Sequence, residues 1–230
     1  MSQQKPSRPL VRIPNIEPKQ EEIPDLAQLA VATGGALITG GLYFGIGTRL
    51  QVISPLVVII VLILTTVPSL GWIIVKRRLL PYRLGRLVAL THVVVLGALL
   101  VLSLARLVVV LPSYSQGRDL LRDGALLWVI NVLIFSTGYW EIDGNGPVNR
   151  MRSHHEASDF MFPQQQGGNR TGWAPGFIDY LFLAFCFSTA LSPADSMPLT
   201  KRGKLLVMAQ ASISLIIIVL LIGRSVNILA

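Results

Sequence analysis

The stretch FIDYLFLAFCFSTALSPADSMPLTKRGK (177–204), followed by LLVMAQASISLIIIVLLIGRSVNILA (205–230), decides the fold of this chain. An apolar run of fifteen residues, Phe177–Leu191, is followed by a polar turn and a basic step, Lys201–Lys204. A long apolar helix is expected from Leu205 to Ile228. Apolar runs of 18 or more residues with almost no charge are typical of membrane helices. Residues 177–230 are therefore expected to form a helical hairpin in a membrane.

The composition extends this interpretation to the whole chain. Of its 230 residues, 52% are hydrophobic and only 14% are charged, against about a quarter charged in a typical globular domain. Several long apolar runs predict an all-α, multi-pass membrane protein. The net charge of +8 comes from cations in short loops between these runs, which orient a membrane protein and argue against a nucleic-acid partner. The one cysteine, Cys186, excludes an internal disulfide.

Four regions follow along the chain. Residues 1–25 are polar and rich in proline and are expected to be a disordered tail. Residues 26–140 are expected to contain four transmembrane helices, and residues 141–176 a polar loop before the hairpin. The four helices are expected at Leu26–Ile46, Val52–Val75, Leu87–Leu111 and Gly124–Trp140.

The loop 76–86 sets the expected orientation. It has five cations and no acid in eleven residues, and such loops stay on the cytoplasmic side. The N-terminus and the loop 141–176 are then cytoplasmic too, in a multi-pass protein of the plasma membrane.

The first expected helix has two ridges of small residues. Ala32, Ala36 and Gly40 recur at four-residue spacing, as do Gly41 and Gly45. Small residues let neighbouring membrane helices approach closely. Packing within the chain is favoured over dimerisation.

The loop 141–176 is interpreted as solvated and as a place where a protein partner can bind. His155 and Asp159 are four residues apart and could share a helical face, as metal ligands do. Two ligands do not make a site, so no metal site is predicted.

The number of spans depends on Phe177–Leu191. Fifteen residues reach about 22 Å as a helix, which is shorter than the hydrocarbon thickness of about 30 Å. If this run spans, there are six transmembrane helices. If it is re-entrant, five helices span and the cations at 201–204 move to the cytoplasmic side, as the charge rule prefers. Six spans are favoured, because re-entrant backbone must be buried in protein or line water.

The hairpin resembles the pore module of two-span potassium channels over about fifty residues. Thr189-Ala190-Leu191-Ser192-Pro193-Ala194-Asp195 aligns with the filter sequence, and Pro198-Leu199-Thr200 aligns with the Pro-x-Thr step after it. The resemblance implies that Thr189, Ser192 and Asp195 line a constriction. Gln210 lies where such inner helices often have a glutamate. Ser192 and Ala194 replace filter glycines, so a potassium filter of the usual kind cannot form from these residues.

The last ninety residues or so also resemble a family of uncharacterised bacterial membrane proteins. The residues that carry this likeness are Trp140-Glu141-x-Asp143-Gly144, Asp159-Phe160-Met161-Phe162-Pro163-Gln164, Phe177-x-Asp179-Tyr180 and Leu191-Ser192-Pro193-x-Asp195. The resemblance implies a location in the membrane and no particular activity.

Two functions follow as hypotheses. The first is an ion-permeation or channel-like protein, expected to be a homo-oligomer in the lipid bilayer. The second is a structural or regulatory membrane component that binds a protein partner through residues 141–176. No catalytic residue and no cofactor site is predicted, since the acidic residues and histidines show no recognised catalytic spacing.

Overall fold

The structure, a computed structural model, is a bundle of helices. It describes the backbone of residues 26–76, 82–114, 117–169, 171–189 and 196–229. Side chains are described for residues 34–66, 86–114, 117–169, 171–189 and 196–224. The predicted tail, 1–25, lies outside both sets. The α-helices are α1 (Leu26–Gly45), α2 (Pro55–Lys76), α3 (Tyr82–Val110), α4 (Gly117–Ile142), α5 (Pro147–Arg152), α6 (Phe177–Thr189) and α7 (Lys201–Leu229).

Short elements connect these helices. Three single-turn 3₁₀ helices are η1 (Leu111–Ser113), η2 (Asp143–Asn145) and η3 (Pro163–Gln165). Two strands of two residues, β1 (Phe160–Met161) and β2 (Met197–Pro198), pair antiparallel, with Phe160 opposite Pro198. The predicted all-α class is therefore confirmed for the described part of the chain, apart from this small ladder.

Three described helical stretches are long and apolar enough to cross a membrane: Arg86–Ser113, Gly117–Asn145 and Lys201–Arg224. Pro55–Thr66 and Phe177–Thr189 are shorter apolar stretches. These lengths agree with a membrane protein, and they do not confirm the expected six spans.

Two helices begin earlier than the sequence predicted. α3 begins at Tyr82 instead of Leu87, and α4 begins at Gly117 instead of Gly124. The hydrophobicity of a run marks where apolar side chains begin, whereas backbone hydrogen bonds continue through polar residues. Part of the basic stretch 76–86 is therefore the first turn of α3 and not a loop.

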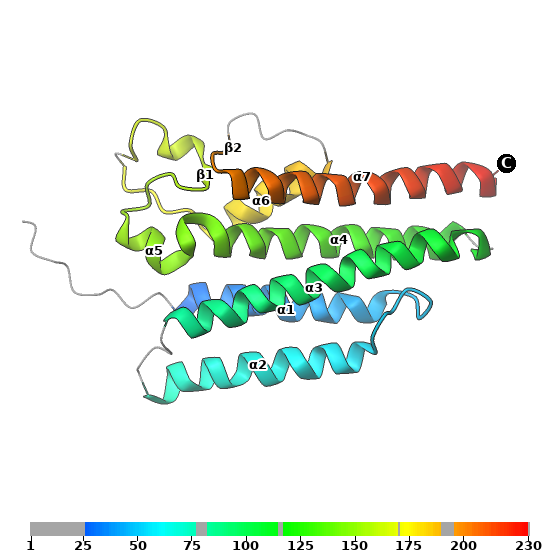
Figure 1. Ribbon diagram of the computed structural model, residues 1–230, viewed down its shortest axis with the longest axis horizontal. Coiled ribbons are helices and arrows are strands. Elements are labelled where there is room, and N and C mark those ends of the chain that lie inside the picture. Colours follow the sequence, from blue (N-terminus) through cyan, green and yellow to red (C-terminus); the bar gives the residue numbers. More distant parts are fainter. Residues whose placement is uncertain (1–25, 77–81, 115–116, 170, 190–195, 230) are drawn as a thin grey trace, which may run out of the picture.

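The long helices run alternately in opposite directions, and α4 lies at the centre of the bundle (Figure 1). It packs against α1, α3, α6 and α7. About 61% of the apolar window of α4 is buried inside the protein, against 17% for α7, which lies at the periphery. Central helices that contact protein on most sides have little surface left for lipid.

The two ends of the bundle differ. At one end, here called the capped end, α2 and α4 finish, α3 and α7 begin, and the segment 143–176 covers the helices (Figure 1). At the other end, the far end, short connections join α1 to α2 and α3 to α4. α7 also finishes at the far end, where Arg224 donates a hydrogen bond to the carbonyl of Tyr114.

Helix α6 covers only part of the bundle's length. It begins at the capped end, where Phe177 packs edge-to-face on Trp140 at 6.2 Å between ring centroids. Its last turn lies beside Trp128, whose indole N–H donates to the carbonyl of Ser188 at 3.4 Å. Trp128 is about 21 Å along α4 from Ile142. α7 then begins again at the capped end, since Met197 and Pro198 pair with β1 there.

Of the small residues that the sequence singled out in α1, Gly40 and Gly45 pack against other helices of the chain and Gly41 does not. A Cβ on Gly40 would lie 2.5 Å from Cδ1 of Leu62 on α2, and one on Gly45 would lie 3.0 Å from Leu126 on α4. Leu62 is buried, so it has little room to move. Gly41 is exposed, and a Cβ there meets nothing within 4 Å.

We expect Gly40→Leu to destabilise the bundle and Gly41→Leu, on the same helix, to leave its stability unchanged or slightly raised. Overpacking costs about 1–3 kcal/mol, which lowers Tm by about 3–10 °C in a chain of this size. Thermal unfolding of the two variants in detergent micelles checks this. Equal Tm values would contradict the packing of α1 against α2.

Candidate functional site

The tip of α6 is the first place where polar groups gather inside the bundle. Gln210 of α7 is fully buried, and its amide joins three helices. Its Nε2 donates to the carbonyl of Ala184 and to Oγ of Ser188, both at 2.8 Å, and its Oε1 accepts from the hydroxyl of Tyr139 at 2.5 Å. One side chain thus ties the last turns of α6 to α4 and α7.

A second polar pair continues this row along α4 and α7. Asn131 is fully buried, and its Nδ2 donates to Oγ of Ser214 at 2.7 Å. Among the described residues its Oδ1 has no hydrogen-bond partner. Gln210, Asn131 and Ser214 therefore form a polar strip between α4 and α7, and they orient α7 against α4.

The four candidate pore-lining residues, Thr189, Ser192, Asp195 and Gln210, differ in burial and in whether the structure describes them. Gln210 is sealed inside the protein. Thr189, next to Ser188, is half-buried, and its hydroxyl donates to the carbonyls of Phe185 and Cys186 in its own helix. Ser192 and Asp195 lie outside the described residues. The structure therefore brings Thr189 and Gln210 to the same level of the bundle, and only Thr189 reaches the surface.

The second polar cluster lies at the capped end and begins with Asp143. Its side chain is 1% exposed. Oδ1 accepts from the backbone N–H groups of Asp159 at 2.8 Å and of Phe160 at 3.2 Å. Oδ2 accepts from the hydroxyl of Tyr180 at 2.5 Å. One carboxylate at the end of α4 thus holds both β1 and the first turn of α6.

Asp159 extends the cluster to the start of α7. Its carboxylate is fully buried and forms an ion pair with Arg202, with Oδ2 2.5 Å from the guanidinium. Oδ1 also accepts from the hydroxyl of Thr200 at 2.5 Å, and Oδ2 accepts from the N–H of Gly144 at 3.1 Å. Burial alone would raise the pKa of Asp159, but the bonds from Arg202, Thr200 and Gly144 outweigh it and lower that pKa below its usual value.

Arg150 of α5 closes the cluster over aromatic rings. Its guanidinium lies 4.5 Å from the ring centre of Trp140 and 5.2 Å from that of Tyr180. Its NH1 donates to the carbonyls of Trp140 and Asp143, at 2.5 Å and 2.8 Å. Cations are attracted to the faces of aromatic rings, most strongly when they are removed from water. Arg150 is 2% exposed, so the segment is anchored to α4 from inside.

This arrangement differs from the solvated loop expected for residues 141–176. Many of its residues are buried, and the side chains of Gln165 and Asn169 donate to backbone carbonyls within the segment. Polarity along the sequence suggested a loop, because buried polar residues and solvated ones look alike until their partners are known. In the sequence, the aromatic residues near Asp143 and Asp159 (Trp140, Phe160 and Phe162) were the sign that this segment is buried.

The pairing of His155 with Asp159 as metal ligands is not supported by the geometry. Both oxygens of Asp159 are bonded to Arg202, Thr200 and Gly144. Across the residues that the structure describes, no group of three or more His, Cys, Asp or Glu could hold a metal ion. The polar cluster at the capped end joins the helix ends through hydrogen bonds and an ion pair.

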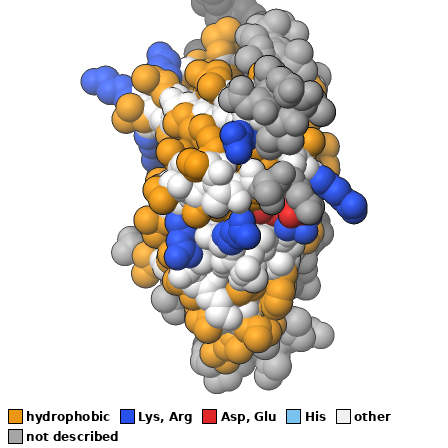
Figure 2. Space-filling model, turned by 90° about the vertical axis from the view of Figure 1, so that its right-hand side faces the viewer, with side chains coloured by type: hydrophobic (Ala, Val, Ile, Leu, Met, Phe, Trp, Pro, Cys, Tyr) orange, Lys and Arg blue, Asp and Glu red, His pale blue; other side chains and the backbone are white. Residues whose placement is uncertain are grey.

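The far end has one buried carboxylate. Asp123 accepts from the hydroxyl of Tyr114 at 2.7 Å, from the N–H of Gly47 at 3.0 Å and from Arg122 at 3.1 Å. Figure 2 shows Lys and Arg side chains at several places on this face, among hydrophobic and other side chains, and only a small area of acidic surface. The arginines described at this end are Arg49, Arg106, Arg118, Arg122 and Arg224.

No known protein family, curated protein or solved structure matches the chain.

We expect Asp159→Asn to lower the Tm at neutral pH by about 5–10 °C, because breaking a buried ion pair costs about 3 kcal/mol. The folded-state pKa of Asp159 is lowered, so its stabilisation is present above the unfolded-state value of about 3.9 and is lost as pH falls below it. Thermal unfolding of both proteins from pH 7 to pH 3 should show a wide Tm difference that narrows below about pH 4.

The exposed Asp119 of α4 provides the control. Asp119→Asn should shift the Tm by less than about 3 °C at every pH, since a charge at an exposed helix N-terminus contributes under about 1 kcal/mol. If the Tm difference between the wild type and Asp159→Asn stays constant down to pH 3, the charge of Asp159 does not stabilise the fold.

Proposed function

We propose that the chain is an integral membrane protein of channel-like architecture, with five spanning helices and α6 as a re-entrant helix. The observation that carries this proposal is the path of α6. It enters beside Trp140, its last turn reaches Trp128 about 21 Å along α4, and α7 starts again beside Asp159. Non-helical backbone at membrane depth is tolerated only inside protein or beside water. A helix that ends at this depth therefore favours a protein with a water-filled path.

The distribution of cations supports one orientation for this arrangement. α2 ends at Lys76 and α3 begins with Arg83 and Arg86 in its first turns, so these three cations lie at the capped end. Lys201, Arg202 and Lys204 at the start of α7 are at the same end. Loops rich in Lys and Arg remain cytoplasmic. The capped end is then cytoplasmic, with the N-terminus inside and the C-terminus outside.

The contacts at the tip of α6 indicate where a permeation path would run. Gln210 and Ser188 are buried and bonded to each other inside one chain. Thr189 is the predicted pore residue with some exposure. A path past Thr189 would therefore follow the outer side of α6, between copies of the chain in a homo-oligomer. α6 would enter from the cytoplasmic side, whereas the pore helix of a potassium channel enters from outside, and this difference counts against a pore of the potassium-channel kind.

The orientation is tested by labelling single cysteines in a Cys186→Ala background with an impermeant thiol reagent. We expect Lys201→Cys and Arg152→Cys to react from the cytoplasmic side and Arg118→Cys from the outside. All three positions are exposed. If Lys201→Cys instead reacts from the same side as Arg118→Cys, then α6 spans the membrane and six helices cross it.

Permeation is tested by ion flux into proteoliposomes that contain the purified protein. We expect a measurable flux, reduced at least about fivefold by Thr189→Val and by Asp195→Ala. Thr91→Val is the matched control, because its hydroxyl also donates to a carbonyl four residues earlier in an exposed stretch of helix, and it should leave the flux unchanged. No flux from the wild type would exclude this function. Flux that survives both pore substitutions would exclude these residues as its lining.

A second candidate function is partner binding at the capped end. The observation in its favour is that the segment 143–176 is folded and anchored, so its exposed residues form a fixed surface. Deleting residues 148–168 would also remove Arg150 and Asp159, so a loss of binding would not be specific. Reversal of exposed charge, as in Glu156→Lys, tests for a partner without disturbing the buried cluster.

A further inference from the structure

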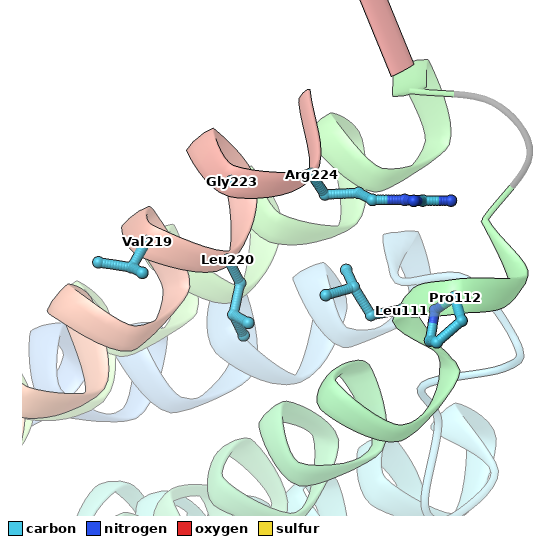
Figure 3. Close-up of a pocket in the computed structure, with 6 residues that line it drawn as sticks. All are labelled: Leu111, Pro112, Val219, Leu220, Gly223 and Arg224. Carbon is cyan, nitrogen blue, oxygen red and sulfur yellow. The ribbon is translucent and has the colours of Figure 1, made fainter. Parts of the chain in front are cut away.

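An apolar groove lies at the far end between η1 and the last turns of α7. It has a volume of ≈ 270 Å³ and is lined by Leu111, Pro112, Val219, Leu220, Gly223 and Arg224. Figure 3 shows Arg224 extending from α7 above Leu111 and Pro112, with the side chain of Leu220 extending downward from α7. The groove thus has an aliphatic floor and one cationic side chain at its edge.

The position of Arg224 along α7 corresponds to a membrane interface. Lys204, near the start of the helix, is exposed, and Arg224 follows it by twenty residues. Twenty residues of helix extend about 30 Å, which matches the hydrocarbon thickness of a bilayer. With Lys204 at one headgroup layer, Arg224 lies at the other, and the aliphatic residues between them lie at the depth of the acyl chains.

The guanidinium of Arg224 is only partly engaged by the protein. Its NH2 donates to the carbonyl of Tyr114 at 3.2 Å. Its Nε is buried and has no hydrogen-bond partner among the residues that the structure describes. A buried donor without a partner is unfavourable, and an anionic oxygen is the partner that a guanidinium binds best.

The charge of the far end also favours an anion. Five described arginines and two described carboxylates, those of Asp119 and Asp123, lie there. Asp123 is already bonded to Arg122, Tyr114 and Gly47. Among the described residues no carboxylate forms an ion pair with Arg224, so its charge is available to a ligand.

We propose that this groove binds one membrane phospholipid, with the phosphate against Arg224 and an acyl chain along Leu111, Val219 and Leu220. The aliphatic lining continues into exposed side chains that face the same depth, Val109 and Ile222. A phosphate presents oxygens to a planar guanidinium in a geometry that ammonium groups do not match. The proposal depends on the chain lying in a membrane and does not depend on permeation.

Two substitutions remove different parts of the site. Arg224→Gln removes the charge and keeps much of the side-chain length. Gly223→Leu fills the groove, because Gly223 is exposed and a Cβ there meets nothing within 4 Å. Leucine is also a better helix former than glycine, so this variant should fold at least as stably as the wild type. Arg118→Gln is the control, since Arg118 is an exposed arginine at the same end.

The experiment is native mass spectrometry of the full chain released from detergent micelles and titrated with phosphatidylglycerol. We expect a one-to-one adduct whose Kd rises at least about fivefold in Arg224→Gln and in Gly223→Leu and is unchanged in Arg118→Gln. Dioleoylglycerol, which has acyl chains and no phosphate, should bind at least about fivefold more weakly to the wild type. Thermal unfolding of each variant separates loss of binding from loss of fold.

Three results would overturn the proposal. The first is an adduct that Gly223→Leu leaves unchanged, because the groove would then not hold the lipid. The second is an equal weakening by Arg118→Gln, which would indicate unspecific attraction to the charged end. The third is equal binding of dioleoylglycerol, which would exclude phosphate recognition. If Arg224→Gln does not fold, the titration of Gly223→Leu alone decides whether the groove binds the lipid.

Discussion

The rest of the structure depends on two buried carboxylates, Asp143 and Asp159, at the capped end. Asp143 accepts hydrogen bonds from β1 and from Tyr180 in the first turn of α6, and Asp159 pairs with Arg202 in the first turn of α7. Both carboxylates are almost completely buried. An unpaired charge in such a place would be very unfavourable, because it has lost its contact with water. Their bonds require the start of α6 and the start of α7 to lie at the same end of the bundle.

Inside the bundle, buried polar groups find partners without any charged residue. Gln210 and Tyr139 are fully buried and bonded to each other, and Gln210 is also bonded to α6. In a low-dielectric interior, satisfied hydrogen bonds are strong and an unsatisfied polar atom is unfavourable, so this strip permits few alternative positions of the three helices. The tip of α6 is therefore held within its own chain. Any aqueous path past it would have to run along the side of α6 that these contacts leave uncovered.

The two ends of the molecule use arginine in different ways. At the capped end Arg150 is buried on aromatic rings and Arg202 neutralises a buried carboxylate. At the far end Arg49 and Arg224 donate to backbone carbonyls of the connection between α3 and α4 and keep part of their surface exposed. The first kind stabilises the fold, and the second leaves positive charge exposed at the ends of long apolar helices.

The sequence by itself determined the class of the protein and the places of the helices, because long apolar runs can only be buried in protein or lipid. The expected limits of α1, α2, α6 and α7 agree with the structure to within about four residues, a scatter ordinary for helix ends. Local sequence also indicated that Gly40 packs inside the chain, since small residues mark close approach. The sequence aligned Thr189 with a filter position, whereas the structure has it as the last residue of α6. The sequence could not show that Gln210 is sealed by Tyr139 and Ser188.

Only the tertiary structure decided how the polar residues between the helices are used. Asp143 and Asp159 are sixteen residues apart, and Asp159 and Arg202 are forty-three apart. No periodicity relates residues at such separations, because their partners come from different helix ends brought together by packing. The segment 141–176 therefore looked like a solvated loop in the sequence and is a folded cap in the structure. A polar residue looks the same in a sequence whether it bonds to water or to another buried group, so only the structure shows that α6 and α7 both begin beside this cap.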